Sequence, residues 1–566
     1  MLVAVAVAMG VMALPEAVVH AAAPLAGAPR ALSVASAEES APARMLGRDP
    51  ATPDPTAGER SLVVGPSVAL RGEGPKLAEA YEPAGPLDAA VHALSPRFST
   101  GAISTTFEGL SSGDNQRQLD YRVSPPDPVG DVGPNHYVQM VNLVLAVYSK
   151  SGERLLGPLE LGRLWEGFAL GACREANGDP IVLYDQQHDR WILTQLGVGP
   201  HGEDNGICLA VSTTGDPTGS YYRYAFSTGT NYPDYPKFGI WNDTLVVTTR
   251  EFPYDGGGGI GVYALELNQM LAGHSRVRAL AWYLDATDPV LAPLVGDGLL
   301  PADVDGSKQP AVGSAIALVG TQDDGGLHGA TTDALNIWEL KVSWGTTVRA
   351  RLGLAAQLPV KGFDSMFPCA PGPRDCLAQP GVGPQRYLDI LSYRQRPLWR
   401  LAYRRFAGYE SMVTTQSVHA RPGVAGLRWY EIRRGPGGYS VHQQGTYAPF
   451  DGVNRWMGSI AQDKAGNAAL GFSVVNGVDV FPGIRYVARL ANDPTGTMAQ
   501  RERVIVHGAG AQRSLGSRWG DYSSMNVDPV DDCTFWYVNA YYSAGGSRGS
   551  VVGWQTRIAS FRMPDC

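Results

Sequence analysis

The sequence predicts an all-β fold, a seven-bladed β-propeller behind a disordered leader. The chain holds 69 glycines and 41 prolines among 566 residues, and these residue types supply the tight turns that all-β folds need. Similar strand–turn–strand units begin near residues 127, 179 and 234, at steps of about 50 residues, which matches one propeller blade. Hydrophobic residues make up 44% of the chain, enough for a large core.

The first 23 residues are predicted to be a signal peptide. The stretch Leu2 to Leu14 is apolar, and a run of small residues at 21–23 follows it as a cleavage site would. A buried strand or helix is the alternative. The apolar run is shorter than the ~20 residues of a membrane span, and no later stretch reaches that length. We therefore expect no membrane span in the mature chain.

Residues 24–100 are predicted to be a disordered leader or a propeptide. They are rich in Ala, Pro, Ser and Glu, and they lack a sustained period of 2 or 3.6 residues. The sequence changes at Phe107 to short apolar runs separated by turns, so the propeller domain is placed at 105–566.

Strand-like units then follow one another to the end of the chain. Asp127 to Asn142 gives a Pro/Gly turn and an apolar strand, and Asp179 to Thr194 gives two strands around an Asp-bounded turn. A helical turn is predicted at Leu267 to Leu271, and residues 350–386 form a long insertion. Trp554 to Phe561 would complete the ring. The units open near residues 127, 179, 234, 303, 410, 455 and 518; seven is our count, with six or eight blades as alternatives.

Six cysteines indicate an exported protein, extracellular or periplasmic. They form no CxxC motif and no Cys/His cluster with zinc spacing, so we interpret them as structural. The sequence alone does not choose among the pairings. Proximity along the chain favours Cys173 with Cys208, Cys369 with Cys376, and Cys533 with Cys566.

The charge and the motifs exclude several function classes. The net charge of −8 leaves no basic stripe for a nucleic acid. No HExxH, GxSxG, P-loop or GxGxxG motif is present, which removes support for a zincin, an α/β-hydrolase or a nucleotide-binding protein. We expect a monomer without a cofactor, whose partner is an extracellular glycan or protein.

Acidic turns recur between the predicted strands, at 185–189, 463–467 and 528–532. Asp528, Asp531 and Asp532 are hard oxygen ligands, so a structural calcium site is one interpretation. Tight hairpins use the same residue types, which favours a structural role without calcium. The turns are loosely similar to the aspartate boxes of sialidase-like propellers, although the strict Ser-x-Asp-x-Gly-x-x-Trp form is absent.

Three segments resemble an uncharacterised family of large secreted bacterial proteins with propeller-like folds. They are Arg518 to Tyr537, Asn454 to Ala461 and Pro126 to Tyr137. The resemblance covers roughly 105–566 and implies a secreted propeller-like domain. It brings no catalytic residue to this chain.

The candidate site is the mouth of the predicted channel. In a propeller the first strand of each blade lines the channel, so the segments that open the units converge in space. Their carboxylates and arginines are costly to gather unless paired, and a ring of structural salt bridges is the alternative to a ligand site. The candidate catalytic residues are Asp234, Glu410 and Asp521, and the candidate substrate-binding residues are Arg455, Arg518, Arg485, Lys237, Tyr235 and Tyr522.

Two functions compete for this site. The first is a carbohydrate-active enzyme that hydrolyses or eliminates glycosidic bonds, and the second is a non-catalytic glycan- or protein-binding or adhesion module. The fold cannot decide, because propellers host both. A solvent-open carboxylate pair ~5–9 Å apart would favour the enzyme. An ion pair of Asp521 with Arg455 or Arg518 would favour the binding module.

Overall fold

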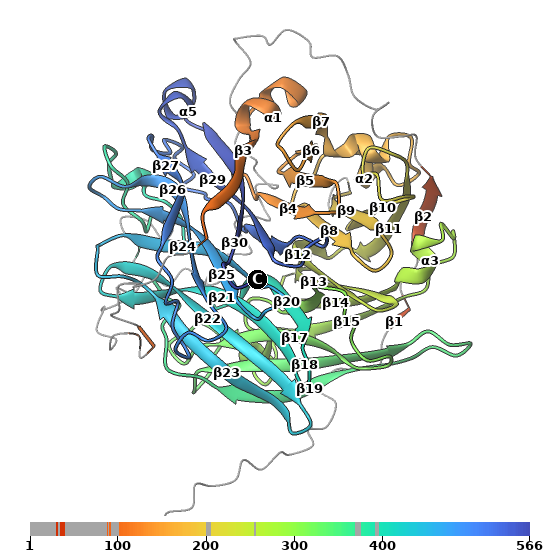
Figure 1. Ribbon diagram of the computed structural model, residues 1–566. Coiled ribbons are helices and arrows are strands. Elements are labelled where there is room, and N and C mark those ends of the chain that lie inside the picture. Colours follow the sequence, from red (N-terminus) through yellow and green to blue (C-terminus); the bar gives the residue numbers. More distant parts are fainter. Residues whose placement is uncertain are drawn as a thin grey trace, which may run out of the picture.

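The chain is all-β in this computed structural model (Figure 1), as the sequence predicts. The structure describes residues 30–31, 34–39, 88, 90–91, 101–199, 205–253, 256–367, 369, 375–390 and 395–566. The predicted signal peptide lies outside these residues.

The first three sheets of the main body are antiparallel meanders, in which consecutive strands are hydrogen-bonded neighbours. Short apolar runs form the strands, and turns of Gly, Asn and Asp join them. The first meander is β4 (Val129–Val132), β5 (His136–Val141), β6 (Val144–Ser149) and β7 (Arg154–Glu160); the second is β8 (Ile181–Asp185), β9 (Arg190–Gly197), β10 (Asn205–Ser212) and β11 (Tyr221–Gly229); the third is β12 (Tyr232–Trp241), β13 (Thr244–Phe252), β14 (Gly259–Glu266) and β15 (Ala279–Asp285).

The next two meanders share one eight-stranded sheet, because β16 pairs in parallel with β20, with Ala302 opposite Leu401. A sixth meander follows as a sheet of its own. The fourth contains β16 (Leu300–Val304), β17 (Ile316–Gln322), β18 (Ala334–Ser343) and β19 (Arg349–Pro359); the fifth β20 (Leu398–Arg405), β21 (Glu410–Arg421), β22 (Val424–Gly435) and β23 (Gly438–Tyr447); the sixth β24 (Asn454–Gln462), β25 (Ala468–Val475), β26 (Phe481–Arg489) and β27 (Arg503–Gly508).

The last sheet joins the two ends of the domain. Its strands are β28 (Ser524–Val527), β29 (Thr534–Tyr542), β30 (Trp554–Arg562) and β3 (Ile103–Ser111). β3 pairs antiparallel with β30, with Phe107 opposite Ile558. The sequence prediction placed Trp554 to Phe561 in this sheet, but it did not reveal that an N-terminal strand supplies the outer edge.

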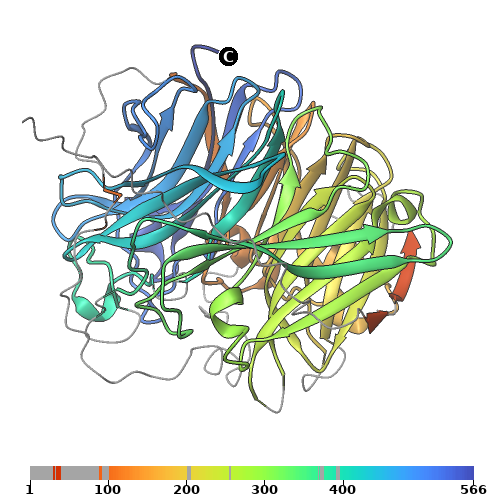
Figure 2. The same cartoon turned by 90° about the horizontal axis from the view of Figure 1, so that it is seen from below.

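The first strands of the meanders form a closed cycle. β4, β8, β12, β16, β20, β24 and β28 each contact the next, and β28 contacts β4. Figures 1 and 2 show the sheets following one another around the molecule in sequence order. Side chains bridge neighbouring first strands, because the backbone N–H groups of Tyr184 and Ile240 donate to Asp131 (2.8 Å) and Asp303 (3.0 Å). These buried carboxylates therefore replace ladder hydrogen bonds that the splayed strands cannot make.

The core lies between adjacent meanders. The inner strands bury both faces, whereas outer strands such as β19 and β23 alternate between buried and exposed residues. Large rings fill the spaces between sheets, among them the fully buried Trp191, Trp338, Trp429 and Trp456.

Helical segments are short and lie between strands. The turn predicted at Leu267 to Leu271 is confirmed as α3. No helix in the described part of the chain is long and apolar enough to cross a membrane. The others are α1 (Ser112–Leu119), α2 (Gly171–Arg174), α4 (Ala292–Val295), α5 (Ala544–Gly549) and the 3-10 turns η2 (Leu161–Trp165) and η4 (Pro384–Arg386).

Parts of the leader lie against the domain. β1 (Arg30–Ala31) pairs with β15, and β2 (Val34–Glu39) pairs with β11, at the outer edges of the third and second meanders. The prediction of a disordered leader did not anticipate these strands.

Three disulfides join Cys173–Cys208, Cys369–Cys376 and Cys533–Cys566, the pairs that proximity favoured. The last one ties the turn before β29 to the C-terminal residue that follows β30.

Candidate functional site

Residues from distant parts of the sequence meet around the segments that open the first strands. Asp127 and Asp179 lie two residues before β4 and β8, Arg396 lies two residues before β20, and β12 itself contributes a short polar run. We call the following set the mouth cluster: Asp127, Asp179, Asp234, Tyr235, Lys237, Arg396, Arg518, Asp521 and Tyr522. It contains six of the residues predicted from the sequence.

A chain of hydrogen bonds fixes the carboxylates of the cluster. The backbone N–H of Asp521 donates to Oδ1 of Asp127 (2.7 Å), and Nδ2 of Asn142 donates to Oδ2 of the same carboxylate (2.6 Å). Oδ1 of Asn142 accepts the backbone N–H of Asp179 (2.9 Å), and Oδ2 of Asp179 accepts that of Tyr235 (3.1 Å). The last, first, second and third meanders are thus connected through these side chains.

Three of the residues joined by these hydrogen bonds have left-handed backbone conformations. Their φ angles are 43° at Asp127, 47° at Asp179 and 52° at Tyr235. Aspartate tolerates this region, but for a bulky residue such as Tyr235 it is a true outlier, which costs on the order of 1–3 kcal/mol. Such strain persists where the surroundings fix the residue, and it is common at functional sites.

The ring of Tyr235 is contacted by two cations. Nζ of Lys237 lies 3.3 Å from the ring centre, and the guanidinium carbon of Arg396 lies 3.5 Å from it. At these distances the two cations cannot both lie on one face of the ring. Lys237 and Arg396 therefore lie on opposite faces of Tyr235. Nζ of Lys237 also lies 4.1 Å from the ring of Tyr522. Cation–π attraction stabilises charges that are otherwise costly to bury.

Burial moves the pKa values of Asp179 and Lys237 toward neutral pH. Burial first, and then the nearby Asp234 and Asp521, raise the pKa of Asp179 to about 7. Burial lowers the pKa of Lys237 to about 7, while Asp179 acts in the opposite direction. The pKa of Asp127 is well above its ordinary value, because of burial and then of Asp521 and Asp179. Groups that titrate near the working pH are typical of functional sites.

The cluster also has a more exposed rim. The side chain of Asp234 is 30% exposed, and Arg250 of β13 lies 3.7 Å from its Oδ2. Arg250 also reaches Oδ1 of Asp297 (3.4 Å), which Nε2 of His328 approaches to 3.3 Å. Although burial opposes it, these partners hold the pKa of Asp297 well below its ordinary value. The accessible groups are therefore arginines and carboxylates.

Glu410 lies elsewhere. It opens β21, and its carboxylate pairs with Nε of Arg434 on β22. The sequence interpretation treated Glu410 as the opening of a first strand, and this was wrong, because β20 is the first strand of that meander. The opening segment of β20 brings Arg396 to the mouth cluster instead.

Arg455 and Arg485 form a second ion-pair group. Nε of Arg455 and Nη1 of Arg485 each lie 2.8 Å from Glu502, and Arg455 also pairs with Asp451 at 2.7 Å. The side chain of Arg455 is only 1% exposed. Both charges are thus compensated within the sixth meander and its flanking loops.

The site contains residues that sequence reasoning did not choose. A sequence signal exists for Asp127 and Asp179, since proline follows each of them just before the first strand of a meander. The sequence gives no local signal for Asn142 and Arg396, because only the fold brings them to the cluster.

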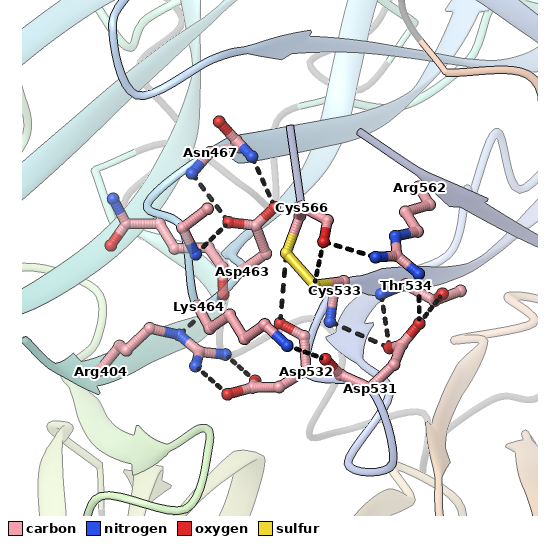
Figure 3. The surroundings of a disulfide bond; sticks show 12 residues. Arg404, Asp463, Lys464, Asn467, Asp531, Asp532, Cys533, Thr534, Arg562 and Cys566 are labelled. Atoms are coloured by element: carbon pink, nitrogen blue, oxygen red, sulfur yellow. Dashed lines mark hydrogen bonds and ion pairs between the residues drawn. A yellow bond between two sulfur atoms is a disulfide. The ribbon is translucent and has the colours of Figure 1, made fainter. Parts of the chain in front are cut away.

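The acidic turns have the hairpin role that the sequence favoured. Figure 3 shows Asp531, whose Oδ1 accepts the backbone N–H groups of Cys533 (3.0 Å) and Thr534 (2.9 Å) beside the disulfide. Arg404 pairs with Asp532 at 2.7 Å, and the backbone N–H of Lys464 donates to the carbonyl of Asp532 (3.0 Å). The turns of neighbouring meanders therefore dock on each other.

Comparisons with known proteins give distant structural likenesses. No protein-family description and no curated protein matches the sequence. An alpha-L-arabinanase of Penicillium chrysogenum complexed with arabinobiose has a TM-score of 0.32 and 8% identity over 84% of this chain and 99% of its own. Bacteroides ovatus xyloglucan PUL GH43B has a TM-score of 0.27 and 10% identity, over 81% and 98%. A subtype N10 neuraminidase-like protein of A/little yellow-shouldered bat/Guatemala/060/2010 has a TM-score of 0.28 and 10% identity, over 68% and 98%. Likenesses this low carry no information on activity.

Proposed function

We propose that the chain is a secreted seven-bladed β-propeller whose mouth cluster cleaves glycosidic bonds. The closed cycle of seven first strands supports the blade count. The three disulfides suit an oxidising, extracellular location.

The observation that carries this proposal is the contrast between two carboxyl groups. Burial raises the pKa of Asp179 to about 7, so this group holds a proton up to neutral pH. Asp521 is ion-paired with Arg518 at 2.7 Å, which favours the carboxylate. Glycosidic cleavage needs one carboxylic acid to protonate the leaving oxygen and one carboxylate to attack, or to activate water.

In this proposal Asp179 is the proton donor, and Asp521 is the carboxylate that acts on the anomeric carbon or on water. Asp234, the more exposed acid, contacts the sugar and raises the pKa of Asp179. Arg518 and Arg250 hold hydroxyl or anionic groups of the glycan. The buried base of the cluster is formed by Lys237 and the two rings that it contacts, Tyr235 and Tyr522, and it holds the acids in position.

The experiment is a polysaccharide panel with the purified full chain and with Asp179→Asn, Asp234→Asn and Asp521→Asn. Each variant keeps the shape of the side chain and removes its acid function. Glu153→Gln is the matched control, because Glu153 is exposed in the turn between β6 and β7. We expect turnover to fall at least 100-fold for Asp179→Asn and Asp521→Asn, on the scale of general acid–base catalysis. Turnover retained in both variants would remove the proposed site.

Glu410, Arg455 and Arg485 remain predictions, and the same panel tests them through Glu410→Gln, Arg455→Gln and Arg485→Gln. Their ion pairs with Arg434, Glu502 and Asp451 give each a structural role. A loss of turnover without a loss of stability would return them to the site.

A non-catalytic binding module is the second candidate, and the Arg518–Asp521 ion pair favours it. A carboxylate already held by an arginine can orient a ligand without reacting. Under this alternative the wild-type chain binds a glycan or a protein with no product release, and Arg518→Gln weakens binding while Asp179→Asn leaves it unchanged.

A further inference from the structure

A short piece of the predicted leader is buried in the fifth meander. Asp88 is 6% exposed, and Arg428 of β22 is fully buried. Nη2 of Arg428 donates to Oδ1 of Asp88, and the Thr446 hydroxyl of β23 donates to Oδ2 at 2.7 Å. Nε of Arg428 donates to the same hydroxyl at 2.7 Å, so the carboxylate meets two side chains that already orient each other.

The backbone of this segment adds to the edge of the sheet. The carbonyl of Ala90 accepts the backbone N–H of Thr446 at 2.9 Å, and Val91 forms a parallel bridge with Thr446. β23 is the outer strand of its meander, so its free edge offers backbone groups to an extended peptide. The backbone N–H of Ala90 donates to Oδ1 of Asp88 (2.8 Å), which joins the carboxylate to the bound backbone.

An apolar cluster completes the contact. Val91 packs against a small cluster apart from the main core, formed by Phe363, Val418, Ala420 and Ala448. The segment thus presents an acid, a backbone carbonyl two residues later and an apolar side chain three residues later to three matching features of the domain.

Without the leader, the other hydrogen-bond partners of Arg428 are neutral. They are the carbonyls of Lys361 (2.8 Å) and Gly362 (3.0 Å), Oε1 of Gln444 (3.3 Å) and the Thr446 hydroxyl. Asp333 acts on Arg428 electrostatically, without a hydrogen bond between them among the described contacts. A buried cation that loses its hydrogen-bonded carboxylate is strongly disfavoured.

We propose that this edge of the fifth meander is a peptide-binding groove for the chain's own leader, with the sequence Asp88 to Val91 as its ligand. The groove recognises an extended peptide by an aspartate and an apolar residue three positions later. A leader that is cut on either side of this segment therefore stays bound to the domain without a covalent link. The proposal is independent of any catalytic activity.

The test uses the full chain with two protease recognition sequences. One replaces residues 73–75 and the other replaces residues 95–97. After folding and cleavage, native gel filtration and mass spectrometry follow the released peptide. We expect it to co-elute with the domain. A wild-type peptide that elutes separately would overturn the proposal.

In a competition experiment the substitutions are made only in added peptides, so they cannot affect the folding of the domain. Labelled synthetic peptides of residues 80–95 are added to the cleaved wild-type complex. We expect the wild-type and Glu82→Gln peptides to displace the bound peptide, and the Asp88→Asn peptide to do so at least tenfold more weakly. Glu82→Gln is the matched control, since it removes another acid of the same peptide. Equal displacement by all three would contradict recognition through Asp88.

Discussion

Nη2 of Arg518 lies 2.7 Å from Oδ1 of Asp521, three residues further along the segment that opens β28. The backbone N–H of Asp521 meanwhile donates to Asp127, which opens the first meander. Asp521 therefore ties the last meander to the first and places a carboxyl group, paired with Arg518, beside two buried acids whose pKa values burial raises.

The first prediction concerns pH and stability. Folding raises the pKa of Asp179 from 3.8 to about 7, so its contribution to stability is fully present below pH 4 and is lost as the pH rises toward 7. Asp179→Asn removes this titration. We expect the variant to gain stability relative to the wild type between pH 4 and 7, by at least about 1 kcal/mol. Urea unfolding at several pH values measures the difference, and a constant difference would contradict the shifted pKa.

The second prediction concerns the aromatic ring between two cations. Tyr235→Leu removes the ring that contacts Lys237 and Arg396, so we expect a loss of about 2–4 kcal/mol in the free energy of unfolding. Tyr235→Phe keeps the ring and is the matched control, with an expected change under about 1 kcal/mol. The hydroxyl makes only a long contact of 3.5 Å to the carbonyl of Asp521. Equal losses in the two variants would show that the ring does not stabilise the cations.

The third prediction concerns ring closure. β3 supplies the outer strand of the sheet that β28 begins. A chain that begins at residue 112 lacks this strand and exposes the edge of β30. We expect it to lose cooperative thermal unfolding and to aggregate, whereas a chain that begins at residue 80 keeps Asp88, the strand and cooperativity. If both truncated chains unfold cooperatively at the same temperature, β3 does not close the ring.

The fourth prediction concerns the second ion-pair group. Glu502→Gln leaves the buried Arg455 without one of its two carboxylates, and we expect a loss of about 3 kcal/mol in stability with turnover unchanged. Asp479→Asn, on an exposed turn, is the control. Chemical denaturation and the polysaccharide assay separate the two effects. A fall in turnover at constant stability would move Arg455 and Arg485 into the site.

The all-β fold could be predicted from the sequence, because apolar runs and turns are local patterns. The role of β3 as the closing strand could not be predicted from the sequence, since its pairing with the distant β30 has no local signature. Glu410 was misplaced because the insertion before β20 hides the true opening of that meander. Arg396 and the Asp88–Arg428 pair depend on contacts between residues far apart in the sequence, which local patterns do not encode.

The most direct test of the central claim is product release from a polysaccharide panel by the wild-type chain and by Asp521→Asn, with equal stability of the two proteins confirmed first. We predict that the wild type releases sugar products from at least one glycan and that Asp521→Asn releases at least 100-fold less. Equal product release by the two proteins would contradict a catalytic role for the mouth cluster.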